Sequence, residues 1–337
     1  HLKDGYAQAI LVNSGNANTC NANGIEIAEQ MCELTQKFTG INKKDVIVAS
    51  TGVIGQPLSI EPIADGMDAL VKGLGDNSDD AAQAIMTTDT VKKEIAVEFE
   101  IDGKKCVIGG IAKGSGMIHP NMATMLGFVT CDANISSDTL QLALSQNVEK
   151  TFNQITVDGD TSTNDMVLVM SNGCTLNEEI LPDTPEFDKF SKMLNFVMQE
   201  LAKKIAKDGE GANKLIQVDV VNAPNALDAR MMAKSVVGSS LVKTAIFGED
   251  PNWGRILAAV GYAGVDVPVD NVDIMLGGLP VMLASSPVSF DDEEMKDIMH
   301  DDEVTITVDL HAGHEKGTAW GCDLSYDYVK INALYHT

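Results

Sequence analysis

The chain has 337 residues, of which 49 are Asp or Glu and 24 are Lys or Arg, so its formal net charge is −25. An acidic surface repels phosphate backbones and anionic lipid, which argues against a nucleic-acid-binding or membrane-surface protein. It favours cationic ligands such as amines or basic amino acids, although such a charge could also serve only to keep the protein soluble. Hydrophobic residues make up 44% of the chain, enough for about two domains or one large α/β unit.

The cysteines are scattered and form neither a CxxC pair nor a Cys/His cluster at zinc-binding spacing. We therefore expect reduced, mostly buried thiols in a cytoplasmic protein, with no metal site and no cofactor. No stretch approaches the roughly 18 apolar residues of a membrane-spanning helix, and the start does not resemble a signal peptide. His1–Gly5 resembles the interior of a protein, so we expect a natural N-terminal portion to precede it.

The first part of the chain alternates short apolar runs with helical patterns. Ala9–Asn13 is a predicted strand, and Ile25–Phe38 is a predicted helix because its apolar residues recur on one stripe. Asp45–Ser50 is a predicted buried strand that ends at a turn formed by Thr51 and Gly52.

Alternation of apolar and polar residues predicts a half-buried strand over Ile95–Ile101. Asp102-Gly103 is typical of a tight hairpin turn and leads into a second strand, Cys106–Ile111. Gly127–Thr130 also has the composition of a strand. This part of the sequence therefore predicts a sheet.

The second half repeats this mixture. Ser136 or Ser137 can cap a helix whose apolar stripe extends to Phe152. Phe187–Lys207 is a longer amphipathic helix that we expect Gly209 to terminate. Val304–Leu310 alternates as a strand does. Together the patterns predict a compact α/β to α+β protein with mixed sheets.

The segment from Lys113 to Phe128, KGSGMIHPNMATMLGF, has the composition of a flexible loop that leads into a strand. A hydroxyl near the start of such a strand, here that of Thr124, suits a nucleophile presented on a rigid element. The lysine precedes the glycines and the order GxxxxGK[ST] is absent, so the segment is not a P-loop. Glycine-rich turns before strands are also common in inert positions, so composition alone leaves Thr124 only a candidate.

Six other segments place small residues, hydroxyls and amides at the ends of apolar elements, where backbone N–H groups can approach a ligand. Each is weak evidence alone because ordinary turns use the same residues, but six in one chain indicate a ligand site. The segments are NSGNAN (Asn13–Asn18), STGVIG (Ser50–Gly55), MTTDT (Met86–Thr90), VDGDTSTND (Val157–Asp165), DGEGANK (Asp208–Lys214) and GEDPNWGR (Gly248–Arg255).

Two apparent motifs are rejected. Asp158–Ser162 opens like a calcium-binding loop, but Thr163 stands where that loop needs glycine and Val169 where it needs a bidentate glutamate. His119 lies shortly before Thr124, but without an obvious third member the two make a poor catalytic triad.

Taken together, these segments resemble the ornithine acetyltransferase family of arginine biosynthesis, the glutamate N-acetyltransferases or ArgJ family. The resemblance extends nearly from end to end, and MATML after KGSGMI is its most specific part. The other matching segments are VNSGNAN, STGVIG, AIMTTDT, TVDGDTSTND, DGEGA, KTAIFGEDPNWGRI and the terminal YVKINALYHT.

The resemblance implies a mixed α/β (α+β) fold, an αββα-type layered sandwich of the self-cleaving DmpA/ArgJ-like superfamily with a smaller C-terminal domain. It also implies that the precursor becomes two chains that share one core. These are an α chain, residues 1–123, and a β chain, residues 124–337, which begins at the nucleophile. Two chains of each kind are expected to form a heterotetramer.

In this family the precursor cleaves itself at an Ala-Thr bond, here Ala123–Thr124, and the new N-terminal threonine is the nucleophile. A threonine hydroxyl needs a base beside it. A freed α-amino group, with an unperturbed pKa of roughly 8, can take the hydroxyl proton. Before cleavage, the same hydroxyl would attack the Ala123 carbonyl and convert the peptide bond into an ester that water then opens.

The implied reaction is a ping-pong acetyl transfer: N2-acetylornithine acetylates Thr124 and leaves as ornithine, and glutamate then leaves as N-acetylglutamate. Matching positions place the oxyanion hole at Thr51 and Gly52. Lys113 suits the substrate α-carboxylate, and Glu210 suits the amine of ornithine. The implied substrate-binding residues are Thr87, Lys113, Thr124, Glu210, Asn332 and Thr337.

Several alternatives stay open. Water could resolve the acyl-enzyme, as in self-cleaving N-terminal-nucleophile aminopeptidases and amidohydrolases, although those relatives typically use serine. Thr124 could instead be a structural residue in a non-enzymatic amino-acid-binding module. The residues do not separate enzymes that also use acetyl-CoA from those that do not, nor Thr87 from Thr88 as the substrate contact. For GEDPNWGR, packing or subunit assembly is the preferred interpretation.

Overall fold

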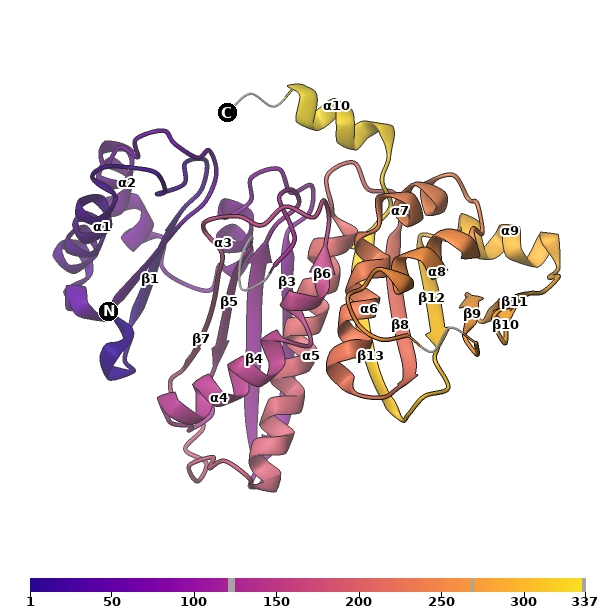
Figure 1. Cartoon of the computed structure of the whole chain (residues 1–337). Helices are drawn as coiled ribbons and strands as arrows, with labels where there is room; N and C mark the ends of the chain where they lie inside the picture. The colour runs from indigo at the N-terminus through magenta and orange to yellow at the C-terminus, as the bar shows by residue number, and fades with distance from the viewer. Residues whose placement is uncertain (121–124, 268–269, 335–337) are drawn as a thin grey trace.

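The computed structural model describes residues 1–120, 125–267 and 270–334, so Ala123, Thr124 and Thr337 lie outside the described residues (Figure 1). The strands are β1 (Ala9–Asn13), β2 (Val46–Ser50), β3 (Lys93–Ile101), β4 (Lys104–Lys113), β5 (Leu126–Cys131), β6 (Ile155–Thr156), β7 (Met166–Ser171), β8 (Leu215–Ala223), β9 (Asp273–Leu276), β10 (Leu279–Leu283), β11 (Ser286–Pro287), β12 (Glu303–Asp309) and β13 (Glu315–Cys322).

The α-helices are α1 (Gly24–Thr39), α2 (Glu61–Lys72), α3 (Ser78–Ala84), α4 (Ser137–Val148), α5 (Pro185–Lys207), α6 (Ala226–Gly238), α7 (Ser240–Phe247), α8 (Trp253–Gly261), α9 (Asp292–His300) and α10 (Tyr326–Leu334). Short 3₁₀ helices are η1 (Leu2–Asp4), η2 (Lys43–Asp45) and η3 (Phe152–Gln154). None of the helices in the described part of the chain combines the length and apolar character needed to cross a bilayer.

The N-terminal layers form because successive strand residues point to opposite faces. Strands β1 and β2 pair in parallel. Leu11 and Val48 pack with Met31 of α1, on one face of this sheet. Ile10 and Ile47 lie on the other face and pack against the second sheet. The pair of strands therefore lies between helices and a sheet.

The second sheet has the strand order β3–β4–β5–β7, in which β5 and β7 are parallel. Phe128 of β5 packs toward β1 and β2, whereas its neighbour Val129 packs with Leu194 and Leu201 of α5. The layer order is thus helix, sheet, sheet, helix, as Figure 1 shows from α1 across to α5. This arrangement confirms the predicted αββα sandwich.

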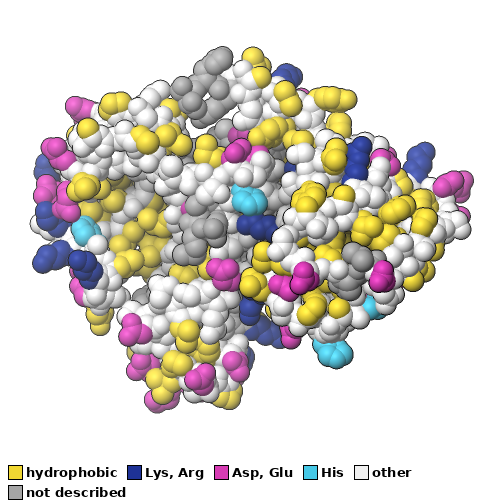
Figure 2. Space-filling model, in the orientation of Figure 1, with side chains coloured by type: hydrophobic (Ala, Val, Ile, Leu, Met, Phe, Trp, Pro, Cys, Tyr) yellow, Lys and Arg dark blue, Asp and Glu magenta, His cyan; other side chains and the backbone are white. Residues whose placement is uncertain are grey.

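A third sheet lies in the C-terminal part of the chain, with the order β11–β10–β9–β12–β8–β13–β6 among the described residues. Helix α6 packs closely on β13 and β8, and Val218, Val220 and Val236 are fully buried in this second core. Acidic side chains are spread over several elements on the face drawn in Figure 2, not gathered into one patch.

The observed helix ends differ from two of the predictions. Helix α4 is capped by Ser136, whose side chain accepts a hydrogen bond from the Thr139 N–H, but the helix ends at Val148. The chain then turns, and the Thr151 hydroxyl donates to the Asn147 carbonyl at 2.8 Å in this turn. The predicted continuation to Phe152 is therefore wrong.

Gly209 does not terminate α5 as a left-handed cap. The helix ends at Lys207, and Asp208 is the cap residue. A Cβ on Gly209 would lie 2.6 Å from the Cys322 sulfur and 3.1 Å from Val157. Close packing, and not a positive φ, therefore explains this glycine.

A substitution at Gly317 of β13 tests how closely α6 packs on this strand. A Cβ there would lie 2.3 Å from the Arg230 backbone nitrogen, and a helix backbone cannot move aside cheaply. We expect Gly317→Ala to lower the free energy of unfolding by roughly 1–3 kcal/mol, measured by urea denaturation. In the control, Gly66→Ala in α2, the Cβ meets no atom within 4 Å. That change should leave stability unchanged or raise it by up to about 1 kcal/mol. Equal midpoints for both variants would contradict this account of the α6 contact.

Candidate active site

The first two loops of the site are held together because β1 and β2 are parallel and end at the same edge. The Ala17 N–H donates to the Val53 carbonyl at 2.9 Å, and the Val53 N–H donates to the Gly15 carbonyl at 3.2 Å. Gly52 has a φ of +126°, and a Cβ there would lie 2.2 Å from the Gly15 carbonyl carbon. This position therefore requires glycine on both grounds.

The segment before β7 closes on the same edge. The Asn164 side-chain amide donates to the Ser50 carbonyl at 3.1 Å. Leu126 of β5 lies opposite Met166 of β7, and the Met166 N–H donates to the Met125 carbonyl at 2.9 Å. Met125, the residue that follows Thr124 in the sequence, is thereby held beside the start of β7.

A buried ion cluster joins three further segments. The Lys93 ammonium is fully buried and lies 2.6 Å from both an Asp89 and an Asp208 carboxylate oxygen. Asp89 also accepts hydrogen bonds from the Thr87 N–H at 3.1 Å and the Gly114 N–H at 2.7 Å. Asp208 accepts the Thr90 N–H at 3.0 Å as well as its hydroxyl. We call Asp89, Lys93 and Asp208 the lysine clamp.

Lys113 is the last residue of β4 and only 7% exposed. Burial lowers the pKa of its ammonium, and the nearby Lys93 acts in the same direction. The carboxylates of Asp89, Asp165 and Glu210 act in the opposite direction because they favour the charged form. Lys113 is therefore a buried cation with acidic groups around it.

Glu210 is brought to the same place by the loop that follows the clamp. Its backbone N–H donates to the Ser115 carbonyl at 2.9 Å, and the Asn332 amide donates to its Oε2 atom at 2.9 Å. A Cβ on Gly116 would lie 2.3 Å from the Glu210 carboxyl carbon, so the glycine lets this carboxylate approach the 113–118 segment. The structure thus brings together Lys113, Glu210 and Asn332.

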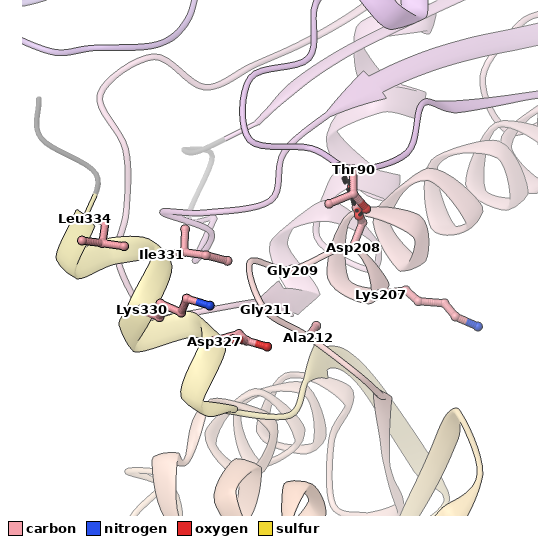
Figure 3. Close-up of a pocket in the computed structure, with 10 residues that line it drawn as sticks. All are labelled: Thr90, Lys207, Asp208, Gly209, Gly211, Ala212, Asp327, Lys330, Ile331 and Leu334. Atoms are coloured by element: carbon pink, nitrogen blue, oxygen red, sulfur yellow. Dashed lines mark hydrogen bonds between the residues drawn. The ribbon is translucent and has the colours of Figure 1, made fainter.

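A pocket of about 440 Å³ lies beneath α10, next to Glu210. Figure 3 shows Thr90 hydrogen-bonded to Asp208 on one side, and Asp327, Lys330 and Ile331 of α10 on the other. Helix α10 therefore covers the loop that carries Glu210.

The rejected motifs have structural roles. Asp158 accepts the Met117 and Ile118 N–H groups at 2.7 and 2.9 Å, so it anchors the loop. The His119 Nδ1 atom lies 3.0 Å from the Thr156 hydroxyl oxygen. Burial, with a contribution from nearby Lys234, lowers the pKa of His119 to about 4, so its ring is neutral at pH 7.

Sequence reasoning missed the clamp residues and Asp165. Asp89, Asp208 and Asp165 each lie in a recognised segment, but nothing in those segments separates them from ordinary turn acids. Lys93 has no local signal at all, because a lysine at the start of a strand is usually exposed. Burial raises the pKa of Asp165 to about 8, against the opposing effects of Lys113 and the Met125 N–H.

GEDPNWGR spans the connection from α7 to α8. Glu249 lies 3.5 Å from the Lys214 ammonium and 2.9 Å from His300 Nδ1. The Asn252 side chain caps α8 by accepting the Arg255 N–H at 3.2 Å. These contacts support the packing interpretation of this segment.

The chain is similar to known proteins along its whole length. The ArgJ family profile matches residues 1–337. The chain belongs to the ArgJ family. A protein from Streptococcus thermophilus (strain CNRZ 1066), described as arginine biosynthesis bifunctional protein ArgJ, is 78% identical over 336 residues, which are 99% of this chain and 84% of the relative. A protein of the same description from Streptococcus mutans serotype c (strain ATCC 700610 / UA159) is 70% identical over 331 residues, 98% of this chain and 83% of the relative.

A crystal structure of the arginine biosynthesis bifunctional protein ArgJ from Bacillus halodurans also matches, with 53% sequence identity and a TM-score of 0.61. The match covers 63% of this chain and all of that chain. The predictions of an ArgJ-family fold and of a biosynthetic enzyme are thereby confirmed.

The lysine clamp should contribute to the stability of the fold. We expect Lys93→Met to lower the free energy of unfolding by about 3–5 kcal/mol, because it leaves Asp89 and Asp208 buried without a cation. Urea denaturation measures this, and adding Asp89→Asn and Asp208→Asn should recover part of the loss. Lys105→Met, which removes an exposed lysine of β4, is the control and should change stability little. A Lys93→Met protein as stable as the wild type would contradict the clamp.

Proposed function

We propose that this chain transfers an acetyl group from N2-acetylornithine to glutamate, with Thr124 as the nucleophile after cleavage between Ala123 and Thr124. The observation that carries the proposal is the convergence of a buried cation, Lys113, and a carboxylate, Glu210, beside the backbone that leads to Met125. Relatives up to 78% identical are described as arginine biosynthesis proteins, which supports the same activity.

The two charges match the two ends of the donor. Lys113 binds the α-carboxylate, because a buried ammonium forms a strong charge-assisted hydrogen bond with a carboxylate. Glu210 binds the side-chain ammonium of ornithine, and Asn332 orients it by holding one of its oxygens. Thr87, whose N–H is held by Asp89 of the clamp, is a further proposed substrate contact. Thr337 is another.

Thr51 and Gly52 form the oxyanion hole in this proposal. The Thr51 backbone N–H already donates to the Asn13 carbonyl at 3.1 Å. We therefore assign the Thr51 hydroxyl and the Gly52 N–H as the donors that stabilise the tetrahedral oxyanion. The close approach of Gly52 to the Gly15 backbone keeps this N–H in place.

In the first half-reaction the Thr124 hydroxyl attacks the acetyl carbonyl and the C–N bond breaks. The hydroxyl proton passes through the Thr124 α-amine to the departing ornithine nitrogen. In the second, the glutamate amine attacks the acetyl ester, and the proton it loses returns to the Thr124 oxygen. Each step conserves protons without a cofactor.

Two processed chains fit this fold. Strand β4 would belong to the 1–123 chain and β5 to the 124–337 chain, yet they pair from Lys113↔Leu126 to Ile108↔Cys131. Six backbone pairs and a common core would keep the two pieces together after cleavage. We further propose two copies of each chain in the assembly and a cytoplasmic location, where unpaired cysteines stay reduced.

Cleavage is the first test of this proposal. Intact mass of the purified protein should give two fragments, 1–123 and 124–337, while Thr124→Ala stays whole because it has no hydroxyl to attack Ala123. The matched control is Thr130→Ala, an exposed threonine of β5, which should cleave as the wild type does. A wild-type protein that remains one inactive chain would refute the proposal.

Acetyl transfer is tested separately from cleavage. The cleaved protein should form N-acetylglutamate from N-acetylornithine and glutamate. The word bifunctional in the names of the relatives supports a second source of acetyl groups, so we also expect acetyl-CoA to acetylate glutamate directly. Acetate release from N-acetylornithine that glutamate does not affect would favour the aminopeptidase-like hydrolase instead.

A further inference from the structure

Self-cleavage and acetyl transfer cannot use the same proton acceptor. On the proposed function, the free α-amine of Thr124 takes the hydroxyl proton during acetyl transfer. In the uncleaved chain the same nitrogen is a peptide amide and cannot act as a base. The attack on Ala123 therefore requires a different group to accept the hydroxyl proton.

Asp165 is held beside Met125, the first described residue after the cleavage site. It directly precedes β7, and the register of β5 and β7, with Leu126 opposite Met166, brings it beside Met125. The Met125 N–H donates a hydrogen bond to the Asp165 carboxyl. Because Met125 follows Thr124 in the sequence, this carboxyl is anchored one residue from the nucleophile.

One oxygen of Asp165 remains available. Its Oδ2 atom is buried and makes no hydrogen bond to the described residues, whereas buried polar atoms are normally paired. Asp165 also lines a second pocket, of about 540 Å³, together with Pro120 and Met125. These two residues flank the segment that contains the cleavage bond.

The surroundings of Asp165 make it a stronger base than an ordinary aspartate. Burial raises its pKa to about 8 even though the Lys113 ammonium, at the end of β4, and the Met125 N–H favour the charged form. The other ionisable side chain that lines the pocket is Glu149, next to α4, and its negative charge acts on Lys234 of α6.

Other described bases nearby are less suitable. The His119 Nδ1 atom is engaged with Thr156, and a pKa of about 4 makes the ring a weak base. The Lys234 ammonium donates to the Pro120 and Asn153 carbonyls at 2.5 and 2.8 Å. Burial lowers the pKa of Lys113 against the opposing effects of Asp89, Asp165 and Glu210, but in the proposed function its ammonium binds the substrate carboxylate.

We propose that Asp165 is the proton acceptor of self-cleavage. Its Oδ2 atom takes the Thr124 hydroxyl proton while the hydroxyl oxygen bonds to the Ala123 carbonyl carbon. The C–N bond then breaks, and the proton passes to the departing nitrogen, which becomes the Thr124 α-amine. Water hydrolyses the resulting ester and returns a proton to the Thr124 oxygen. This inference rests on the proposed function and concerns only its maturation step.

The test follows cleavage of freshly synthesised full-length chain by intact mass. We expect Asp165→Asn to slow cleavage by roughly 100-fold or more, the usual contribution of a general base. Asp165→Glu should recover much of the rate, and Asp160→Asn, an exposed acid of the same loop, should match the wild type. The wild-type rate should rise with pH and level off above about 8, the pKa of Asp165.

Hydroxylamine separates the two stages of cleavage, because it opens an ester but not a peptide bond. An Asp165→Asn chain that cannot form the ester should resist it. Cleavage of Asp165→Asn at the wild-type rate, its rapid opening by hydroxylamine, or a flat wild-type pH profile would each overturn the assignment while leaving the proposed function standing. Thermal unfolding of the variants checks the fold, and the wild-type profile tests the proposal even if a variant misfolds. A wild-type chain that never cleaves would instead refute the proposed function itself.

Discussion

The arrangement of the site depends on the burial of one lysine between two aspartates. Removing the Lys93 charge from water costs several kcal/mol, and the cost is offset only while Asp89 and Asp208 both lie 2.6 Å from it. Asp89 also accepts the Thr87 and Gly114 N–H groups, and Asp208, which lies two residues before Glu210, accepts the Thr90 N–H. The clamp therefore fixes segments from three distant parts of the chain in one geometry.

Much of the fold could be predicted because its signals are local. The alternation in β3 and the Asp102-Gly103 turn specify a hairpin, and Ser136 caps α4 as its position indicates. The clamp could not be predicted, because it joins residues 89 and 93 to residue 208 and no periodicity records such a contact. The role of Gly209 could not be predicted for a related reason. Its close neighbour Cys322 is remote in sequence, so a glycine required by packing has the same sequence pattern as a glycine that ends a helix. Of the predicted site, Lys113, Glu210 and Asn332 do converge, whereas Ala123, Thr124 and Thr337 lie outside the described residues.

The charge distribution connects the fold to the chemistry. The chain is strongly acidic, yet it buries Lys93 and Lys113 close together beside carboxylates. One lysine is neutralised by the clamp, which leaves the other available for a substrate carboxylate. In the account proposed here, proton transfer is divided in time: Asp165 acts before the chain is cleaved, and the amine that cleavage creates acts afterwards.

The acetyl-enzyme is the most direct test of this account. Cleaved protein incubated with N-acetylornithine, without glutamate, should gain the mass of one acetyl group on the 124–337 fragment. Fragmentation should place that group on Thr124, and adding glutamate should remove it as N-acetylglutamate. A fragment that never gains an acetyl group, or that carries it on another residue, would contradict the account.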